Sequence, residues 1–265
     1  MLSTDAIHAH TFDRFKYHKY PQLFGSMWLI SHKATVRESG LLEGFRDSHC
    51  HLLPGVDDGV QEVDETMHIL DEWERLGVKE VWLTPHIMED MPNKPGELRA
   101  RMEEVKNRYA GSIELHLAAE HMMDGLFVKR LADGDMMPIG TEGRRLLVET
   151  SYFTPPMNMS ALFEKIESKG YEPILAHPER YHYMGRKDYC YWKERGVMLQ
   201  LNVPSLVGAY GLDVQKKAEW LLNHGMYDYC GSDTHSLEYV EYFLDSSISR
   251  KIVRKVKELS EEQIL

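Results

Sequence analysis

Short apolar runs alternate with amphipathic segments of helical length from residue 45 to the end of the chain. In the segment 62–76, apolar side chains recur at three- and four-residue spacing and Gly77 follows as a stop signal, which is typical of a helix. The same reasoning predicts helices over residues 62–76, 96–109, 158–169, 188–195, 214–224 and 248–259. Apolar runs between them predict strands over residues 45–48, 78–83, 113–118, 145–148, 173–176, 197–201 and 226–231.

Strands that alternate with helices in this way indicate an α/β fold with a parallel sheet, either open or closed. A parallel barrel usually takes about 250 residues, so this stretch of roughly 220 fits a slightly small or distorted one. No linker rich in Pro, Gly or Ser divides residues 45–265, and we expect them to form one domain. Residues 1–44 lack a sustained period and predict an N-terminal extension or arm.

Composition narrows the function classes. The 265 residues include 31 basic and 42 acidic ones, a net charge of −11, which argues against non-specific nucleic-acid binding. No apolar run approaches the ~20 residues of a spanning helix, so we expect no membrane insertion. Three cysteines are too few for a disulfide framework, and the N-terminus has no signal-peptide pattern, so we expect a cytoplasmic protein.

Histidines and carboxylates follow six of the predicted strands. Because the carboxyl ends of the strands in a parallel barrel meet at one mouth, these side chains are expected to converge there. The residues in question are His49, His51, His86, Glu120, Glu149, His177, Asp233 and His235.

The spacing of these residues suits a metal site. In His49-Cys50-His51 the side chains alternate, so both imidazoles can face one ion while the thiol points away. Asp233-Thr234-His235 repeats this arrangement, and Asp58 adds a carboxylate beside a glycine in the loop after the first strand. Neutral imidazoles and carboxylates suit Mn, Fe, Zn or Mg. The neighbouring Asp57 is interpreted as part of the acidic turn that opens the next helix.

Seven short motifs resemble the PHP (polymerase and histidinol phosphatase) superfamily, and especially its capsule-associated, metal-dependent tyrosine-protein phosphatases of bacteria. The motifs are Asp47–His51, Val56–Gly59, Thr84–His86, Ala118–Glu120, Leu147–Glu149, Ala176–Arg180 and Ser232–His235. The resemblance runs from about residue 45 to 259 and implies the PHP fold, a distorted (β/α)7 TIM-like barrel. It also implies three divalent ions, with Mn²⁺ expected first and Fe, Zn or Mg as other choices.

The resemblance also implies how the ligands are shared. The first ion would be held by His49, His51, Glu120 and Asp233; the second by Glu120, Glu149 and His177; the third by Asp58, His86 and His235. Four carboxylates against three divalent ions leave a local charge of about +2, which favours a phosphoester substrate.

The charge therefore favours hydrolysis of a phosphoester by a metal-bound hydroxide, without a covalent enzyme intermediate, and the resemblance implies that the substrate is protein phosphotyrosine. Arg180 would bind the phosphate, and Asp233 and His235 would join it as catalytic residues. The implied partner is a phosphotyrosine-bearing protein such as the cytoplasmic tail of a polysaccharide-export tyrosine kinase.

A nucleophilic-cysteine phosphatase is excluded, because none of the three cysteines is followed six positions later by arginine.

Several alternatives remain open at this point. Residues 87–90 and 236–239 lack the arginines that phosphotyrosine-specific members often carry. Arg180 is then the one arginine placed at the site unless Arg186 or Arg144 reaches it, so phosphate binding would rely more on the metals and the natural substrate could differ. The other hypotheses are a small-molecule phosphomonoesterase of the histidinol-phosphatase type, an amidohydrolase-like metal hydrolase and a non-enzymatic kinase-binding scaffold. His8 and His10 imitate the metal motif but are interpreted as a solvated arm.

Overall fold

The computed structural model describes residues 33–263 and residue 265. The contacts divide the chain into two units, residues 1–31 and residues 32–265, and the described helices and strands belong to the second unit. The interpretation of His8 and His10 as a solvated arm lies outside the described residues.

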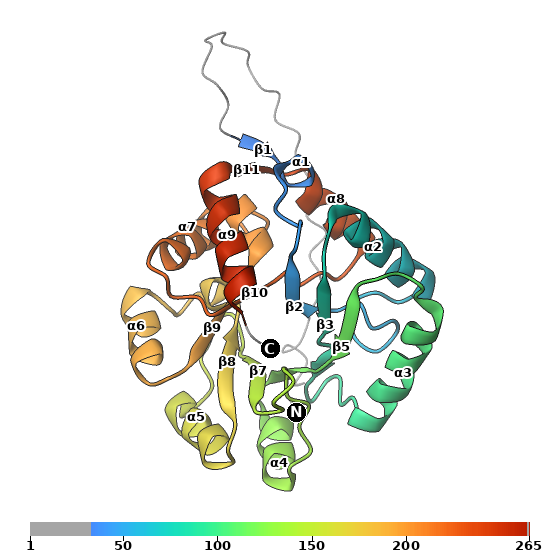
Figure 1. Ribbon diagram of the computed structural model, residues 1–265. Coiled ribbons are helices and arrows are strands. Elements are labelled where there is room, and N and C mark those ends of the chain that lie inside the picture. Colours follow the sequence, from blue (N-terminus) through green and yellow to red (C-terminus); the bar gives the residue numbers. More distant parts are fainter. Residues whose placement is uncertain (1–32, 264) are drawn as a thin grey trace, which may run out of the picture. The chain divides into compact units, whose positions relative to one another are not determined.

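The strands at the centre of the unit are parallel and lie in two sheets (Figure 1). The three-stranded sheet has the order β2-β3-β5, with β2 at Arg46–Cys50, β3 at Glu80–Leu83 and β5 at Glu114–Leu117. The six-stranded sheet has the order β10-β9-β8-β7-β6-β4. Its strands are β4 (His86–Ile87), β6 (Glu120–Met122), β7 (Arg145–Glu149), β8 (Glu172–Ala176), β9 (Met198–Asn202) and β10 (Tyr229–Gly231). The predicted α/β fold with parallel strands is confirmed.

The second and third predicted strands are each followed by a short strand in the other sheet. Thr84 and Pro85 separate β3 from β4, and Ala118 and Ala119 separate β5 from β6. Proline has no backbone N–H for the ladder, which explains the first break. After the breaks, β4 and β6 begin with His86 and Glu120, whose side chains are buried. The hydrophobic pattern predicts one strand in each of these two regions. It does not reveal the second short strand or the change of sheet.

Helices surround the strands (Figure 1). Those that the sequence predicted are α2 (Val63–Leu76), α3 (Pro95–Arg108), α5 (Met159–Ser168), α6 (Arg186–Glu194), α7 (Leu212–Asn223) and α9 (Arg250–Glu262). The sequence pattern missed α4 (Gly125–Asp133) and α8 (Leu237–Asp245), each only nine residues long. It also missed the 3-10 helices η1 (Pro178–Arg180) and η2 (Val203–Val207). No described helix is long and apolar enough to cross a membrane.

Residues 33–44 pack against the C-terminal part of the unit. The strand β1 (Lys33–Thr35) pairs antiparallel with β11 (Ser247–Ser249), and the short helix α1 (Val36–Ser39) follows. The backbone N–H of Val36 donates to the carbonyl of Ser246 at 2.9 Å. Because residues 247–249 are used in this pairing, α9 begins at Arg250 rather than at the predicted residue 248.

The two faces of the parallel strands pack into different clusters. On β7, Leu146 and Val148 join the large cluster that includes buried helix side chains, whereas Leu147 joins a smaller cluster on the opposite face. Successive strand side chains point to opposite faces, so Glu149 at the end of β7 shares the face of Leu147. The alternation therefore directs this carboxylate to the side of the small cluster, with Ile174 and Ala176 of β8.

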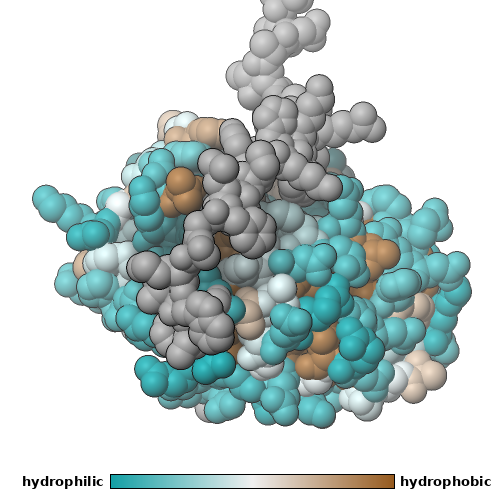
Figure 2. Space-filling model, turned by 90° about the horizontal axis from the view of Figure 1, so that it is seen from above, coloured by the Kyte–Doolittle hydropathy of each residue, from teal (hydrophilic) through white to brown (hydrophobic). Residues whose placement is uncertain are grey.

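Large hydrophobic side chains are mostly buried. The surface view shows small hydrophobic patches on a largely hydrophilic face (Figure 2). Among the described residues, the exposed large hydrophobic side chains are Phe153, Met157, Tyr191 and Leu212.

The end of β10 lies directly against β2. The N–H of Asp233 donates to the carbonyl of His49 at 2.8 Å, and the N–H of His51 donates to the carbonyl of Thr234 at 2.9 Å. A Cβ on Gly231 would lie 2.5 Å from the Cβ of His49, closer than real atoms approach. Glycine at position 231 is therefore required for this close contact.

We expect Gly231→Ala to lower the free energy of unfolding by about 1–3 kcal/mol, because the added methyl group forces β10 away from β2. Thermal and denaturant unfolding measure the change. The matched control is Gly96→Ala in the first turn of α3, where an added Cβ meets nothing within 4 Å. This control should be neutral or slightly stabilising, and equal effects of the two substitutions would contradict the prediction.

Candidate metal centre

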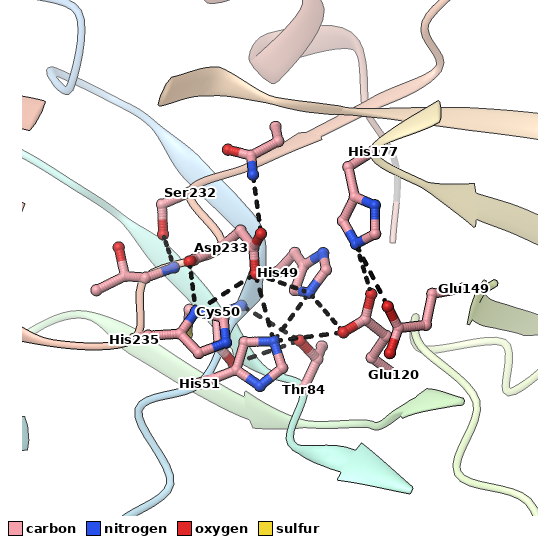
Figure 3. A network of polar contacts seen from close by, with 12 residues as sticks. His49, Cys50, His51, Thr84, Glu120, Glu149, His177, Ser232, Asp233 and His235 are labelled. Atoms are coloured by element: carbon pink, nitrogen blue, oxygen red, sulfur yellow. Dashed lines mark hydrogen bonds and ion pairs between the residues drawn. The ribbon is translucent and has the colours of Figure 1, made fainter. Parts of the chain in front are cut away.

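The strand ends and the loop after β2 bring all nine predicted metal ligands into one cluster. Figure 3 shows His49, His51, Glu120, Glu149, His177, Asp233 and His235 of this cluster. Within the described part of the chain, four groups have ligand atoms within 4.8 Å of one another. The groups are His51/Asp58/His86/His235, His49/His51/Asp233, His49/Glu120/His177 and His86/Glu120/Glu149. Most members are buried, and Asp58 is the exposed one.

Two histidines of β2 and its following loop aim their ring nitrogens at each other. The Nε2 atoms of His49 and His51 are 3.1 Å apart. Glu120 Oε2 lies 3.2 Å from the first and 3.4 Å from the second, and Asp233 Oδ1 lies 3.5 and 3.4 Å from them. Four potential ligand atoms from four side chains therefore surround one point.

The outer nitrogens of the same two rings fix their tautomers. His49 Nδ1 lies 2.7 Å from Gln200 Oε1, and His51 Nδ1 lies 2.8 Å from Asp57 Oδ2. These oxygens can only accept, so each Nδ1 carries the proton and, in a neutral ring, each Nε2 presents a lone pair. Two lone pairs and two carboxylate oxygens that face one point repel one another unless a cation lies between them. The donor set therefore fits a divalent metal ion.

Glu120 connects this point to the rest of the cluster. It is fully buried, its Oε1 lies 2.9 Å from His177 Nε2, and its Oε2 lies 3.1 Å from His86 Nδ1. His86 Nδ1 is also 3.1 Å from Glu149 Oε1, while its Nε2 is 3.5 Å from Asp58 Oδ1. The two oxygens of the Glu120 carboxylate thus face different groups of potential ligands.

Each member of the His86/Glu120/Glu149 group has a buried atom without a hydrogen bond: His86 Nδ1, Glu120 Oε2 and Glu149 Oε1. A buried polar atom without a partner is costly, and buried polar atoms in native proteins are almost always satisfied. These atoms belong to one of the four groups, so a shared cation would satisfy all three.

The charges of the cluster point the same way. Burial would raise the pKa of Glu120, but the surrounding imidazoles, His49 foremost, hold it well below its ordinary value. Burial and the His51 ring would lower the pKa of His86, yet the carboxylates of Glu149 and Glu120 raise it to about 9. The buried Glu120 carboxylate therefore stays ionised and attracts positive charge. A metal ion provides that charge and displaces protons from the imidazoles.

Two of the ligand-bearing positions have strained backbone. His177 has φ of 34° and Asp233 has φ of 51°, both in a left-handed region that non-glycine residues rarely adopt. Such strain persists only where the surroundings hold it, and it is concentrated at functional sites. Here it turns each side chain toward the cluster directly after β8 and β10.

Arg180 reaches the cluster. It lies in η1, its guanidinium donates from Nη1 to Asp233 Oδ2 at 2.5 Å, and its side chain keeps 16% exposure. The rings of Tyr152 and Tyr210 lie 4.5 and 4.2 Å from its guanidinium carbon.

The two other arginines considered from the sequence are engaged elsewhere. Arg186 stacks on Trp220 at 5.1 Å, and Arg144 pairs with Glu142 just before β7, at the opposite end of that strand from Glu149.

Asp57 is the residue whose importance the sequence interpretation missed. Its Oδ2 accepts from the backbone N–H of His86 at 3.0 Å and also contacts the His51 ring. Its Oδ1 accepts from the backbone N–H of Gly59. A Cβ on Gly59 would lie 2.2 Å from the His51 carbonyl oxygen, so only glycine allows the loop to fold back this closely. The available sequence signal was an aspartate two positions before a glycine. The same residues also fit an acidic first turn of a helix, so the signal was ambiguous.

The thiols do not take part in this arrangement. Burial raises the pKa of Cys50 and Cys230 well above the ordinary value, and Cys190 is exposed on α6. Neither buried thiol is therefore a ready thiolate nucleophile.

A parallel α/β fold with buried imidazoles and carboxylates at its strand ends has the arrangement of an α/β protein whose strand ends could hold metal ions. The chain belongs to the family described as "Capsular polysaccharide synthesis, CpsB/CapC", which matches residues 45–265. The expected resemblance to capsule-associated tyrosine phosphatases is confirmed by this family and by three relatives that are named tyrosine-protein phosphatases.

Three curated relatives are each 25% identical to this chain. The putative tyrosine-protein phosphatase CapC of Staphylococcus aureus aligns over 222 residues, 82% of this chain and 86% of the relative. Tyrosine-protein phosphatase YwqE of Bacillus subtilis aligns over 72% of this chain and 78% of its own length. Tyrosine-protein phosphatase CpsB of Streptococcus pneumoniae aligns over 80% and 93%.

A solved structure has the same fold. It comes from work on YwqE from Bacillus subtilis and CpsB from Streptococcus pneumoniae, described as unique metal-dependent tyrosine phosphatases. The TM-score is 0.69 at 22% identity, and the match covers 82% of this chain and 93% of the other.

We expect Asp57→Asn to weaken retention of divalent metal about 10- to 100-fold, because the substitution removes the charged partner that orients His51. Competition with a chelator, followed by metal analysis of the protein, measures this. The matched control is Asp71→Asn, an exposed position on α2, which should leave metal retention unchanged. Unchanged retention in Asp57→Asn as well would show that Asp57 has only a packing role.

Proposed function

We propose that this chain is a metal-dependent phosphatase that hydrolyses phosphotyrosine in proteins. The observation that carries the proposal is the buried convergence of imidazoles and carboxylates on shared points, with Arg180 at its edge. Membership of the CpsB/CapC family and the names of the relatives give the substrate class.

We assign the metal ligands as the resemblance implies. His49, His51, Glu120 and Asp233 would hold one ion, Glu120, Glu149 and His177 a second, and Asp58, His86 and His235 a third, with Mn²⁺ as the first expectation. The groups His49/His51/Asp233 and His51/Asp58/His86/His235 support the first and third sets. For the second set, His177 Nε2 lies 2.9 Å from Glu120 Oε1 and 3.9 Å from Glu149 Oε2, although Glu149 also groups with His86. When bound, divalent ions polarise a phosphoryl group and acidify coordinated water.

The chain's own residues orient the substrate. Arg180 presents a cation at the edge of the cluster, between the rings of Tyr152 and Tyr210, where it can bind a phosphate through charge-assisted hydrogen bonds. Asp233 contacts both Arg180 and the two β2 histidines, so it couples the phosphate position to the metal ligands. Asp57 and Gln200 hold the histidines in the ligating tautomer.

We further infer that the strands close as a distorted (β/α)7 barrel of the PHP type. The backbone hydrogen bonds between β2 and the end of β10 support closure between the two sheets. The family match over residues 45–265 supports a phosphatase domain there, preceded by an extension over residues 1–44.

The cellular setting is part of the proposal. The free state of all three cysteines supports a cytoplasmic location. The partner would be a phosphotyrosine-bearing protein, and the capsule context of the family favours the tail of a polysaccharide-export tyrosine kinase.

Metal-stripped protein that is given Mn²⁺ should release phosphate from a phosphotyrosine peptide and from p-nitrophenyl phosphate. The activity should disappear with a chelator and survive thiol alkylation, since the buried cysteines are not thiolates. A phosphate-release assay that includes histidinol phosphate decides the class. Turnover of histidinol phosphate alone would move the protein to the small-molecule alternative, and no release from any of these substrates would refute phosphatase activity.

Arg180→Lys should lower kcat/KM for phosphotyrosine peptide roughly 10- to 100-fold, because lysine keeps the charge but loses the planar fork. Steady-state kinetics with unchanged bound metal isolate the effect. Arg186→Lys, away from the cluster on Trp220, is the control and should keep wild-type kinetics. A fully active Arg180→Lys enzyme would exclude bidentate phosphate binding by this residue.

A further inference from the structure

A groove next to the metal centre has the chemistry of a peptide-binding surface. We infer that it binds the stretch of substrate polypeptide that flanks the phosphotyrosine, and that it prefers apolar side chains there over acidic ones. The inference rests on the proposed function and specifies its substrate class.

The groove has a volume of about 600 Å³ and lies between α5, α6 and the loops that follow β7 and β8. Met159, Met184 and Trp192, all largely buried, line it together with Pro155 and Pro156. The lining side chains are therefore mainly apolar and held in place by the core. Such a concave surface is suited to receive an apolar side chain from another chain.

One loop joins the groove to the phosphate-binding position. The loop starts directly after Glu149, and its Tyr152 ring lies 4.5 Å from the Arg180 guanidinium carbon. Thr150 Oγ1 is 2.5 Å from the hydroxyl of Tyr183, which also lines the groove. Pro155 and Pro156 lie only a few positions further along the same loop. A polypeptide whose phosphotyrosine contacts Arg180 would thus pass over this loop, with the groove next to it.

The same loop exposes apolar side chains to solvent. Met157 is 91% exposed and Phe153 74% exposed, the highest values among the large hydrophobic side chains of the described residues. The Phe153 ring stacks on His182 of the neighbouring loop, with centroids 5.0 Å apart and planes within 2°. An ordered, exposed aromatic pair beside an apolar groove is typical of a protein-binding surface.

The charges at the groove distinguish between peptide types. Its charged lining residues are Glu164 and Asp188, both acidic. Glu164 pairs with Arg195 at 2.8 Å, and Asp188 accepts from the Gly185 N–H at 2.8 Å. Arg195 compensates the charge of Glu164, so the like charge that an acidic flanking residue would meet is that of Asp188, whereas an apolar residue would bury the groove surface. The electrostatics therefore favour an apolar flank.

The test compares two phosphotyrosine peptides on the metal-loaded, full-length protein, one with leucines and one with aspartates on both sides of the phosphotyrosine. The wild type should show the lower KM for the leucine peptide. Ala161→Trp fills the groove from an exposed position on α5 and removes no core side chain. It should raise KM for the leucine peptide about tenfold, the cost of about one good interface contact, and leave p-nitrophenyl phosphate kinetics unchanged.

The matched control is Ala100→Trp, the same substitution at an exposed position of α3, which should leave both peptides unaffected. Met157→Ser, between the lining residues Pro156 and Asn158 on the adjoining loop, provides a second variant with little risk to folding, and Leu212→Ser, an exposed hydrophobic position on α7, is its control. A wild type without peptide preference, or equal effects of variants and controls, would overturn the groove inference while phosphatase activity stands. A wild type that releases no phosphate from any substrate would overturn the proposed function instead.

Discussion

The arrangement of the site depends on one constraint, the burial of the Glu120 carboxylate among other charged and lone-pair-bearing atoms. This fully buried side chain faces His177 with one oxygen and His86, His49 and His51 with the other. A buried carboxylate is tolerated only when positive charge compensates it. The histidines around it provide that charge as protons or direct their lone pairs at a cation, so metal binding and stability of the centre are coupled.

The convergence of these side chains requires close backbone contacts and a strained backbone at two positions. Gly231 and Gly59 allow β10 and the loop after β2 to approach the β2 histidines more closely than any Cβ permits. His177 and Asp233 adopt positive φ at the ends of their strands. These features are spread over elements far apart in the sequence, and each of them places a side chain that contributes to the cluster. The strain is consistent with a rigid centre that exists before substrate arrives.

The sequence predicted the convergence of these side chains better than the elements that hold them. Histidines and carboxylates after apolar runs are visible in the sequence, and parallel topology is enough to bring them together. By contrast, the change of sheet after Leu83 and after Leu117 depends on local hydrogen bonding that no hydrophobic period encodes. The short helices α4 and α8 carry too few turns for a clear period, and each starts at a side-chain cap. Asp57 acts through contacts across the loop, which spacing alone does not reveal.

The environment of Arg180 bears on the question of the missing arginines. A single guanidinium binds phosphate effectively if its position is fixed before binding, because less side-chain entropy is then lost. Here Asp233 holds one end and two tyrosine rings hold the faces. Burial of the Tyr152 phenol raises its pKa well above the ordinary value, so the ring stays neutral beside the cation. Under the proposed function, preorganisation of Arg180 would replace a second arginine, and the loop that carries Tyr152 would shape both phosphate binding and the groove next to it.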